Sequence, residues 1–380
     1  MENELEELIK SLNEMNKLNF CLVEIIKDMA GLINALHELK DMVEMDDIKN
    51  AIVRQIQMML VLAYKNNGKF EGQMLHGVIY GPPGVGKTSV AKIIAKIFNS
   101  IGVQKSVKMD TYDRSMSLSE ILIRVEKLKE TYENRLLDEI QEIAMKMIND
   151  VDDEVLDITN VDQIPKGLHE DKDESYIVIC GRPELVAEYA GQTSIKCRNF
   201  LNSNKGKMII IEEAYSLYTG ERDQFGLEAL TELNRFMDEN PNDIIVYFTG
   251  YKDMIENTIF KAQPGLKRRC TFLFEIPGYS YRGLAKVFQT QLEKSGWTTT
   301  VDLEKFFKGN EKYFPHYGGD TLRLSFHAKQ VYSGNVFKNF KNQNKPPKLV
   351  IDDEILKTAF ERYKKLSGIN EVKEINNMYI

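Results

Sequence analysis

The chain has 380 residues, enough for two or three domains with at least one buried core. Its hydrophobic content of 43% and charged content of 28% are typical of a globular protein and exclude wholesale disorder. The net charge of −7, without a strongly basic domain, argues against nucleic acid as the main partner. The apolar runs are shorter than the ~18 residues that cross a bilayer and the first residues are acidic, so we expect a cytoplasmic protein with no membrane partner.

Residues 1–44 are predicted to form an N-terminal helical extension. Leu, Ile and Met recur at a spacing of three and four from Leu5 to Leu36, interrupted only by Asn19. This spacing is that of a coiled coil, but further apolar residues flank the stripe and favour packing against a neighbouring domain or bundle. A second helix is predicted around Asp47 to Tyr64.

Five apolar runs separated by helical patterns predict a parallel β-sheet that is covered on both faces, so the fold class is α/β. We assign residues 45–276 to this domain. The candidate strands are His76–Tyr80, Tyr176–Cys180, Met208–Ile211, Ile244–Thr249 and Thr271–Phe274.

The interval between the first two strands, residues 81–175, is much longer than a strand–helix–strand unit of about thirty residues allows. We predict that residues 104–172 form an insertion: one long helix, begun by a capping box at Ser117 to Glu120, and then an acidic loop. The insertion is either solvated decoration or a docking element for a basic partner.

After Ile276 the β character ends. Residues 277–380 are predicted to form a small, all-helical second domain. Its helical patterns are centred on Tyr281–Leu292, Leu303–Phe307, Leu322–Val331 and Asp353–Leu366.

The clearest motif follows the first strand, where residues 81–88 match the phosphate-binding loop G-x-x-x-x-G-K-[ST]. Glycines let the backbone wrap around phosphate, and the N-terminus of the helix that follows points its N–H groups at the anion. We expect Lys87 to neutralise the β- and γ-phosphates of ATP and the Thr88 hydroxyl to bind Mg²⁺. The predicted nucleotide-binding residues are Gly81, Pro82, Pro83, Gly84, Val85, Gly86, Lys87, Thr88 and Ser89.

Two carboxylates follow the third strand. Glu212 and Glu213 come directly after Met208–Ile211, and adjacent residues at a strand end point in opposite directions. One carboxylate can therefore reach the metal through water while the other faces the attacking water. We assign Glu212 to Mg²⁺ and Glu213 to general-base catalysis, against the alternative that both are surface acids closing a strand.

The phosphate loop, the acidic pair and the helical second domain together resemble an AAA+ ATPase. Within that class the chain is similar to the CbxX/CfqX family, which includes the red-type Rubisco activases. The resemblance covers roughly residues 35–100 and 175–365 and implies a P-loop NTPase sheet with a C-terminal helical lid, which binds ATP and Mg²⁺ and assembles into a hexameric ring. The stretches that carry it are Leu185–Thr193, Glu212–Tyr218, Phe225–Leu230, Thr249–Met254 and Asn257–Arg269.

The resemblance implies further roles. Thr249 would hold the attacking water, unless it is an ordinary strand residue. Arg269 would be the arginine finger that reaches the nucleotide of the next subunit; Arg268 is the second choice, and a solvated basic run is the alternative. Arg323 would touch phosphate from the lid of the same subunit, and Ile48 belongs to the segment beside the adenine.

Tyr189, Ala190 and Gly191 resemble the loop that lines the central pore of AAA+ rings. An aromatic side chain can grip an extended polypeptide through non-specific contacts, and glycine permits the tight loop. The alternative is a buried tyrosine in an ordinary turn. A second pore-facing loop is predicted at Thr219–Asp223 on weaker grounds.

These features predict an ATP-hydrolysing AAA+ protein that remodels an unknown protein substrate. The sequence departs from the family at Glu212, where the family usually has Asp; the longer side chain can disturb octahedral Mg²⁺ coordination and slow hydrolysis. Two alternatives therefore stay open: a nucleic-acid loader or initiator on the same fold, and an ATP-gated scaffold that hydrolyses ATP very slowly.

Overall fold

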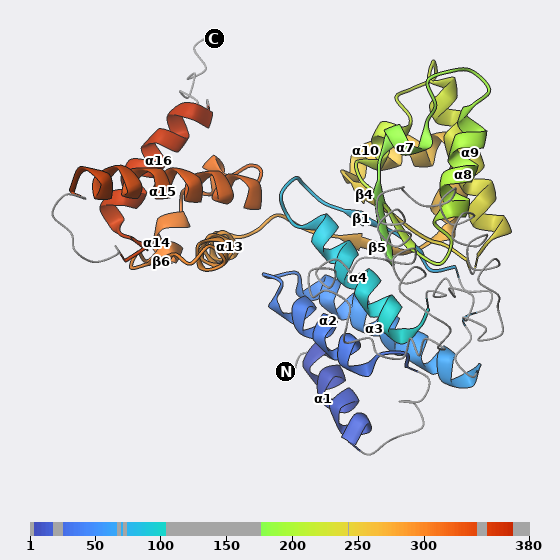
Figure 1. The fold of residues 1–380 in the computed structure, drawn as a ribbon, viewed down its shortest axis with the longest axis horizontal. Coiled ribbons are helices and arrows are strands. Elements are labelled where there is room, and N and C mark those ends of the chain that lie inside the picture. Colours follow the sequence, from blue (N-terminus) through green and yellow to red (C-terminus); the bar gives the residue numbers. More distant parts are fainter. Residues whose placement is uncertain are drawn as a thin grey trace, which may run out of the picture.

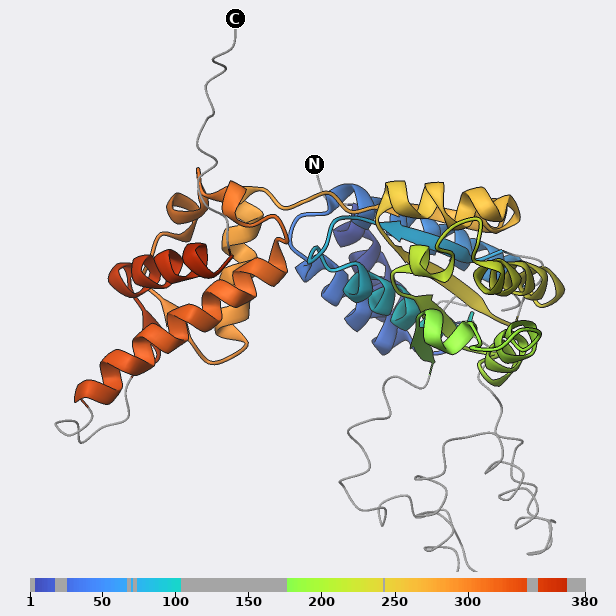
Figure 2. The same cartoon turned by 90° about the horizontal axis from the view of Figure 1, so that it is seen from above.

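The computed structural model describes residues 4–17, 26–66, 70, 74–103, 176–241, 243–339 and 348–367. They form a larger α/β body and a smaller helical body, joined by the segment that follows the last strand of the sheet (Figures 1 and 2). The predicted insertion at 104–172, with its helix and its acidic loop, lies outside the described residues.

The larger body contains a five-stranded parallel sheet, which confirms the predicted fold class. The strand order is β2-β3-β4-β1-β5, and each strand begins and ends within one residue of its prediction. The parallel register brings the carboxyl ends of β1, β3 and β4 to the same edge. The strands are β1 (His76–Tyr80), β2 (Ile177–Cys180), β3 (Met208–Ile211), β4 (Ile245–Gly250) and β5 (Cys270–Glu275).

Helices cover both faces of this sheet, and each face has its own apolar core. Successive strand residues point to opposite faces, so Ile210 packs with α3 (Asp46–Lys65) and α4 (Lys87–Ile101), whereas Ile209 packs with the α8 (Thr193–Ser203) and α9 (Gln224–Glu239) side. Shorter helices complete the second face: α7 (Arg182–Leu185), η3 (Ala214–Leu217), α10 (Lys252–Asn257), α11 (Ile259–Ala262) and α12 (Pro264–Arg269).

The N-terminal extension packs on the α/β body. The apolar spacing from Leu5 to Leu36 does not form one uninterrupted helix, because α2 (Met29–Asp41) has its own start: the Asp28 side chain accepts a hydrogen bond from the Gly31 N–H at 2.8 Å and caps the helix. Helix α1 (Glu4–Lys17) and α2 bury their leucines in the same core as α3 and α4. The structure therefore favours packing on a neighbouring domain over a coiled coil; the predicted seam residue Asn19 lies outside the described residues.

The smaller body is the predicted helical domain, and its core is dominated by aromatic rings. It is not all-helical, because the two-residue strands β6 (Thr298–Thr299) and β7 (Val350–Ile351) pair in parallel. Phe314 stacks on Tyr363, with ring centroids 5.5 Å apart. We call this body the lid; its helices are α13 (Tyr281–Glu293), α14 (Leu303–Phe307), η4 (Glu311–Tyr313), α15 (Gly318–Asn339) and α16 (Asp353–Ser367).

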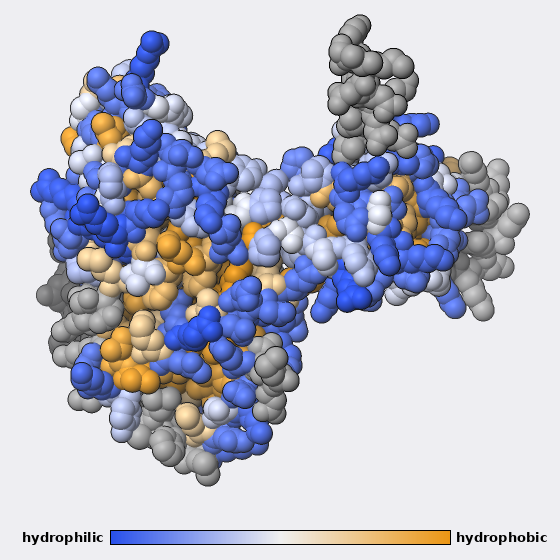
Figure 3. All heavy atoms as spheres, turned by 180° about the vertical axis from the view of Figure 1, so that it is seen from behind, coloured by the Kyte–Doolittle hydropathy of each residue, from blue (hydrophilic) through white to orange (hydrophobic). Residues whose placement is uncertain are grey.

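The surface carries some apolar side chains. Figure 3 shows them gathered on one face of the larger body, and Val61 of α3 and Leu273 of β5 are among the exposed large hydrophobic residues. Across the described ranges, no helix is both long enough and apolar enough to span a bilayer.

Candidate nucleotide site

The predicted phosphate loop connects β1 to α4 at the carboxyl edge of the sheet. Gly84 (φ 73°) and Gly86 (φ 91°) adopt left-handed conformations that other residues rarely take, and α4 begins at Lys87 without a side-chain cap. The first N–H groups of α4 are therefore available to an anion. The Lys87 ammonium donates to the carbonyl oxygens of Gly81 at 2.9 Å and Pro82 at 2.7 Å.

The two carboxylates predicted from the sequence lie beside this loop. The Thr88 hydroxyl donates a hydrogen bond to the Glu212 carboxylate, so the two oxygen donors assigned to Mg²⁺ are in direct contact. Burial lowers the pKa of the Lys87 ammonium, and the Glu213 and Glu212 carboxylates act against this. The structure thus brings Lys87, Thr88, Glu212 and Glu213 together.

These residues fit a Mg²⁺ ion that is held mainly by phosphate and water. Mg²⁺ prefers oxygen ligands and usually keeps several waters, using one or two protein groups plus substrate phosphates. Thr88 and Glu212 offer such oxygens, and the described residues contain no cluster of three or more His, Cys, Asp or Glu that would form an all-protein site.

Glu213 differs from Glu212 in exposure and in backbone conformation. Glu212 is half-buried against Thr88, whereas Glu213 is exposed and has a left-handed backbone (φ 46°, ψ 47°). Burial and the neighbouring Glu213 carboxylate raise the pKa of the Tyr215 hydroxyl, which hydrogen-bonds to that carboxylate. The left-handed turn directs the two adjacent carboxylates to different surroundings, as the acid-pair prediction requires.

Thr249 lies between the phosphate loop and the acidic pair. The residue is 2% exposed, and its hydroxyl donates to the carbonyl oxygen of Ile211, the residue before Glu212, at 3.5 Å. In the sheet it is paired with Ile79 of β1, and the following Gly250 carbonyl accepts from the Gly81 N–H at 3.1 Å. Thr249 therefore lies on β4, between the strand that ends at the phosphate loop and the strand that ends at the acidic pair.

The lid contacts the phosphate loop directly. The Gly318 N–H donates to the Gly84 carbonyl oxygen at 3.1 Å, and the Tyr279 hydroxyl donates to the Val85 carbonyl oxygen at 2.9 Å. A Cβ atom on Gly84 would lie 2.0 Å from the His316 carbonyl oxygen.

Ile48 and Arg323 are the two other residues with predicted roles at the nucleotide, and these roles stay predictions. Ile48 is 4% exposed and packs in the core. Met42, six residues earlier, comes close to the loop: its Cε lies 3.5 Å from a Cβ built on Gly86. Arg323 forms an ion pair with Asp320 at 3.8 Å and lies over the Tyr363 ring at 6.0 Å. Both of these partners belong to the lid.

Arg269 lies at the opposite edge of the sheet from its own phosphate loop, because it immediately precedes β5. Its guanidinium is held by α9: it donates to Asn234 Oδ1 at 2.8 Å and pairs with Asp238 at 2.7 Å. Its side chain is 17% exposed, whereas the neighbouring Arg268 is exposed and makes no ion pair with any residue in the described ranges. Both arginines therefore lie at the amino edge of the sheet, away from the phosphate loop of their own chain.

The predicted pore loop is exposed. Tyr189 is 68% exposed, and Gly191 (φ 77°) has no heavy atom within 4 Å of a built Cβ, so the alternative of a buried tyrosine is wrong. In the second predicted loop the Thr219 N–H and hydroxyl donate to Asp223, which pairs with Arg182 at 2.6 Å. These hydrogen bonds lower the pKa of the Asp223 carboxyl, with Arg182 as the main cause.

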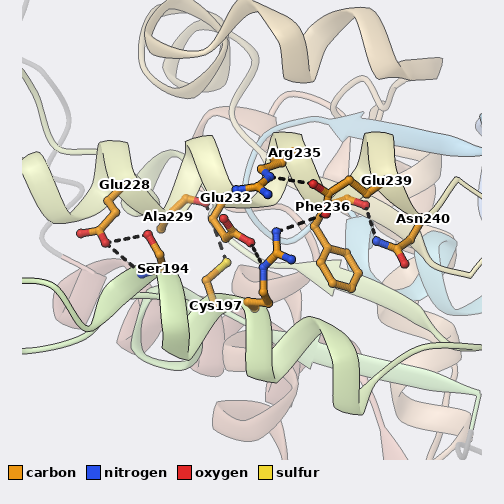
Figure 4. Close-up of polar contacts among 10 residues, drawn as sticks. Ser194, Cys197, Glu228, Ala229, Glu232, Arg235, Phe236, Glu239 and Asn240 are labelled. Carbon is orange, nitrogen blue, oxygen red and sulfur yellow. Dashed lines mark hydrogen bonds and ion pairs between the residues drawn. The ribbon is translucent and has the colours of Figure 1, made fainter.

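Hydrogen bonds and ion pairs join α8, the helix that follows the Tyr189 loop, to α9 (Figure 4). The Ser194 hydroxyl and N–H donate to Glu228, and Arg198 donates to Glu232 and Glu239. Because α9 also holds Arg269, the Tyr189 loop and Arg269 are attached to the same helix pair.

Comparison with known proteins agrees with the AAA+ resemblance seen in the sequence. The AAA family (ATPase family associated with various cellular activities) matches residues 78–181. The chain is 23% identical over 342 residues to a putative cfxQ-like protein of Acanthamoeba polyphaga mimivirus, covering 87% of this chain and 66% of that protein. It is 32% identical over 149 residues to protein CbbX of Cereibacter sphaeroides, covering 38% of this chain and 48% of that protein.

A third relative is the chloroplastic ribulose bisphosphate carboxylase/oxygenase activase of Cyanidioschyzon merolae, 30% identical over 136 residues, which are 35% of this chain and 46% of that protein. The chain therefore spans about half the length of CbbX and of this activase in the matched region.

Proposed function

Because the chain is an AAA+ protein similar to the CfxQ and CbbX proteins, we propose that it binds ATP with Mg²⁺ between the α/β domain and the lid and hydrolyses it. The observation that carries this proposal is the contact between Thr88 and Glu212 next to the Lys87 loop. It joins residues 124 positions apart in the sequence into the donor set that a Mg²⁺-nucleotide needs.

In this proposal each polar residue of the site has one task. The loop amides and Lys87 hold the phosphates, and Thr88 and Glu212 would hold Mg²⁺, Glu212 through water. When bound, Mg²⁺ supplies a Lewis acid that offsets the negative charge of the phosphate oxygens. Glu213 takes a proton from the attacking water, and the Thr249 hydroxyl orients that water.

The site is completed by a second copy of the chain. Arg269 lies at the far edge of the sheet from its own loop, so its charge can stabilise the transferred phosphoryl group only on a neighbouring molecule. A head-to-tail contact of this kind closes into a ring, and we propose a hexamer. Arg269 must leave Asp238 to act, which makes Asp238 its resting partner.

The proposed substrate is a protein or a protein complex. The support is the exposed Tyr189 on a loop attached through α8 and α9 to Arg269, so that a change at the nucleotide can move the loop. One relative is named an activase of ribulose bisphosphate carboxylase/oxygenase. We extend to this chain only the class, a remodeller of protein complexes.

Steady-state ATPase assays test this proposal. Glu213→Gln is expected to reduce kcat at least about a hundredfold, because the general base is lost, while ATP binding persists. Arg269→Ala is expected to reduce kcat about a thousandfold, and Arg268→Ala only slightly. Full ATP turnover in both Glu213→Gln and Arg269→Ala would refute the mechanism. If Arg268→Ala lost turnover and Arg269→Ala did not, Arg268 would be the arginine finger instead of Arg269.

A second function, an ATP-gated scaffold with very slow hydrolysis, is favoured by Glu212. Its side chain is one methylene longer than the usual Asp and already contacts Thr88. In the same assay, tight ATP binding with negligible wild-type turnover that rises in Glu212→Asp would select the scaffold. DNA-stimulated turnover would instead select a nucleic-acid loader.

A further inference from the structure

A carboxylate from the N-terminal part of the chain lies at the start of the first lid helix. The Glu44 carboxylate accepts hydrogen bonds from the Ser280 N–H at 3.2 Å and from the Ser280 hydroxyl. Ser280 is the N-cap residue of α13, and its hydroxyl also accepts from the Gly283 N–H at 3.2 Å. A negative charge is favourable at this end of a helix. Glu44 and Ser280 are 236 positions apart, so the contact links two distant parts of the chain.

The first turn of α13 has room for this carboxylate because residue 283 is glycine. A Cβ built on Gly283 would lie 2.7 Å from Glu44 Cδ and Oε2 and 2.8 Å from Oε1. Glycine in a helix normally destabilises it by about 0.5–1 kcal/mol relative to alanine. The contact with Glu44 supplies a reason for this glycine.

The segment that carries Glu44 is fixed from the other side. Glu44 (φ 57°) and Met45 (φ 65°) form a left-handed turn between α2 and α3. The buried Lys49 ammonium donates to the carbonyl oxygens of Lys40 at 3.0 Å and Met42 at 2.7 Å, which holds the end of α2. Met42 in turn reaches Gly86 of the phosphate loop. These contacts therefore hold the turn at Glu44 and Met45 in place near the phosphate loop.

We propose that Glu44 is a positioning residue for ATP binding: its carboxylate fixes the angle of α13, and thereby holds the lid in the orientation in which Gly318 meets Gly84. Two contacts with the phosphate loop already restrain this angle: Gly318 with Gly84, and the Tyr279 hydroxyl with Val85. Glu44 adds a contact at the start of α13 itself. The kinetic part of this inference rests on the proposed function, whereas the lid geometry does not.

Loss of the contact leaves the lid sampling other angles. ATP then binds only the fraction of molecules with the correct angle, so the apparent affinity falls by that fraction while saturating ATP restores the active state. We expect KM for ATP to rise about fivefold in Glu44→Ala with kcat unchanged. A merely structural defect would instead lower kcat through loss of active protein and leave KM unchanged.

Gly283→Ala provides an independent test on the other side of the contact. The new methyl group displaces the Glu44 carboxylate, which is the end of a flexible side chain, but alanine by itself favours the helix. We expect the same rise in KM despite unchanged or higher thermal stability. The double variant Glu44→Ala/Gly283→Ala is expected to be no worse than Glu44→Ala, because both changes remove one interaction. Glu38→Gln is the control, since Glu38 pairs with Lys96 at 3.0 Å, away from the lid.

Lid geometry is measured without nucleotide, by the spin-label distance between Gln57→Cys in α3 and Lys305→Cys in α14, both exposed. We expect one narrow distance distribution in the wild-type background and in Glu38→Gln, and a broad one in Glu44→Ala and Gly283→Ala. Narrow distributions in both of these variants, or an additive double variant, would overturn the inference. If the wild-type protein did not hydrolyse ATP, only the proposed function would be overturned. The spin-label distances would still show whether Glu44 fixes the lid angle.

Discussion

Four residues other than glycine have a left-handed backbone in the described ranges: Glu44, Met45, Glu213 and Tyr317. Each such residue costs on the order of 1–2 kcal/mol. Glu213 is the proposed general base, Tyr317 precedes the Gly318 contact with the loop, and Glu44 and Met45 form the turn beneath the lid. The strain is concentrated where side chains must be aimed, and the surrounding packing offsets it.

His76, at the start of β1, is a buried residue that predicts a pH dependence of stability. Its Nδ1 accepts from the Val246 N–H at 3.1 Å, and burial together with the nearby Arg269 charge lowers its pKa to about 4. The unfolded chain, with a His pKa of about 6.5, therefore binds the proton more readily than the folded one. Stability is full above about pH 6.5 and falls by up to about 1.4 kcal/mol per pH unit as the pH drops towards 4.

Thermal unfolding between pH 7.5 and 5 checks this prediction. His76→Gln is expected to show a smaller decrease in Tm over this range than wild type, whatever its stability at pH 7.5. His37→Gln, which changes an exposed ring on α2, is the control and should retain the wild-type slope. Equal slopes for wild type and His76→Gln would contradict the burial argument.

At the scale of elements, what sequence analysis predicts well is local. The strands, the phosphate loop and the acidic pair are contiguous runs whose period and residue types carry their structure, and the parallel register then aligns their ends. The contacts Gly318–Gly84, Tyr279–Val85 and Glu44–Ser280 depend on how two bodies meet. No local sequence pattern encodes how two bodies meet, which is why these contacts could not be predicted from the sequence.

The start of α2 and the partners of Arg269 illustrate the same limit. An Asp before a helical run is a capping signal, and Asp28 is the cap of α2. The apolar spacing continues on both sides of Asp28, so the spacing alone does not show that a new helix starts there. The sequence shows that Arg269 is charged, but not that Asn234 and Asp238 bind its side chain. Both partners lie on α9, which is distant from Arg269 in the sequence.

The contact between the α15 start and the phosphate loop predicts the effect of Gly84→Ala. The new Cβ would be strained at φ 73° and would collide with the His316 backbone, so the lid must move away. We expect ATP affinity to fall at least about tenfold, as judged by calorimetric titration. Gly334→Ala in α15 is the matched control, because its Cβ meets nothing within 4 Å and alanine favours the helix. Unchanged affinity in Gly84→Ala would show that lid contact does not matter for binding.

At the scale of the whole molecule, the chain carries the two halves of one proposed active site at opposite edges of its sheet. The loop, Thr88, Glu212 and Glu213 lie at the carboxyl edge, and Arg269 lies at the amino edge. The geometry forbids them to meet within one chain. The central claim is therefore that hydrolysis takes place between two copies, each contributing one half.

The most direct test mixes two inactive variants, Glu213→Gln and Arg269→Ala, and measures ATPase activity after the rings have exchanged subunits. If the site is shared, an interface between the intact Glu213 of one copy and the intact Arg269 of the next is active, and random mixing should restore about a quarter of the wild-type rate. If the mixture stays as inactive as its components although mixed rings form, each chain must hold a whole site, and hydrolysis between two copies is contradicted.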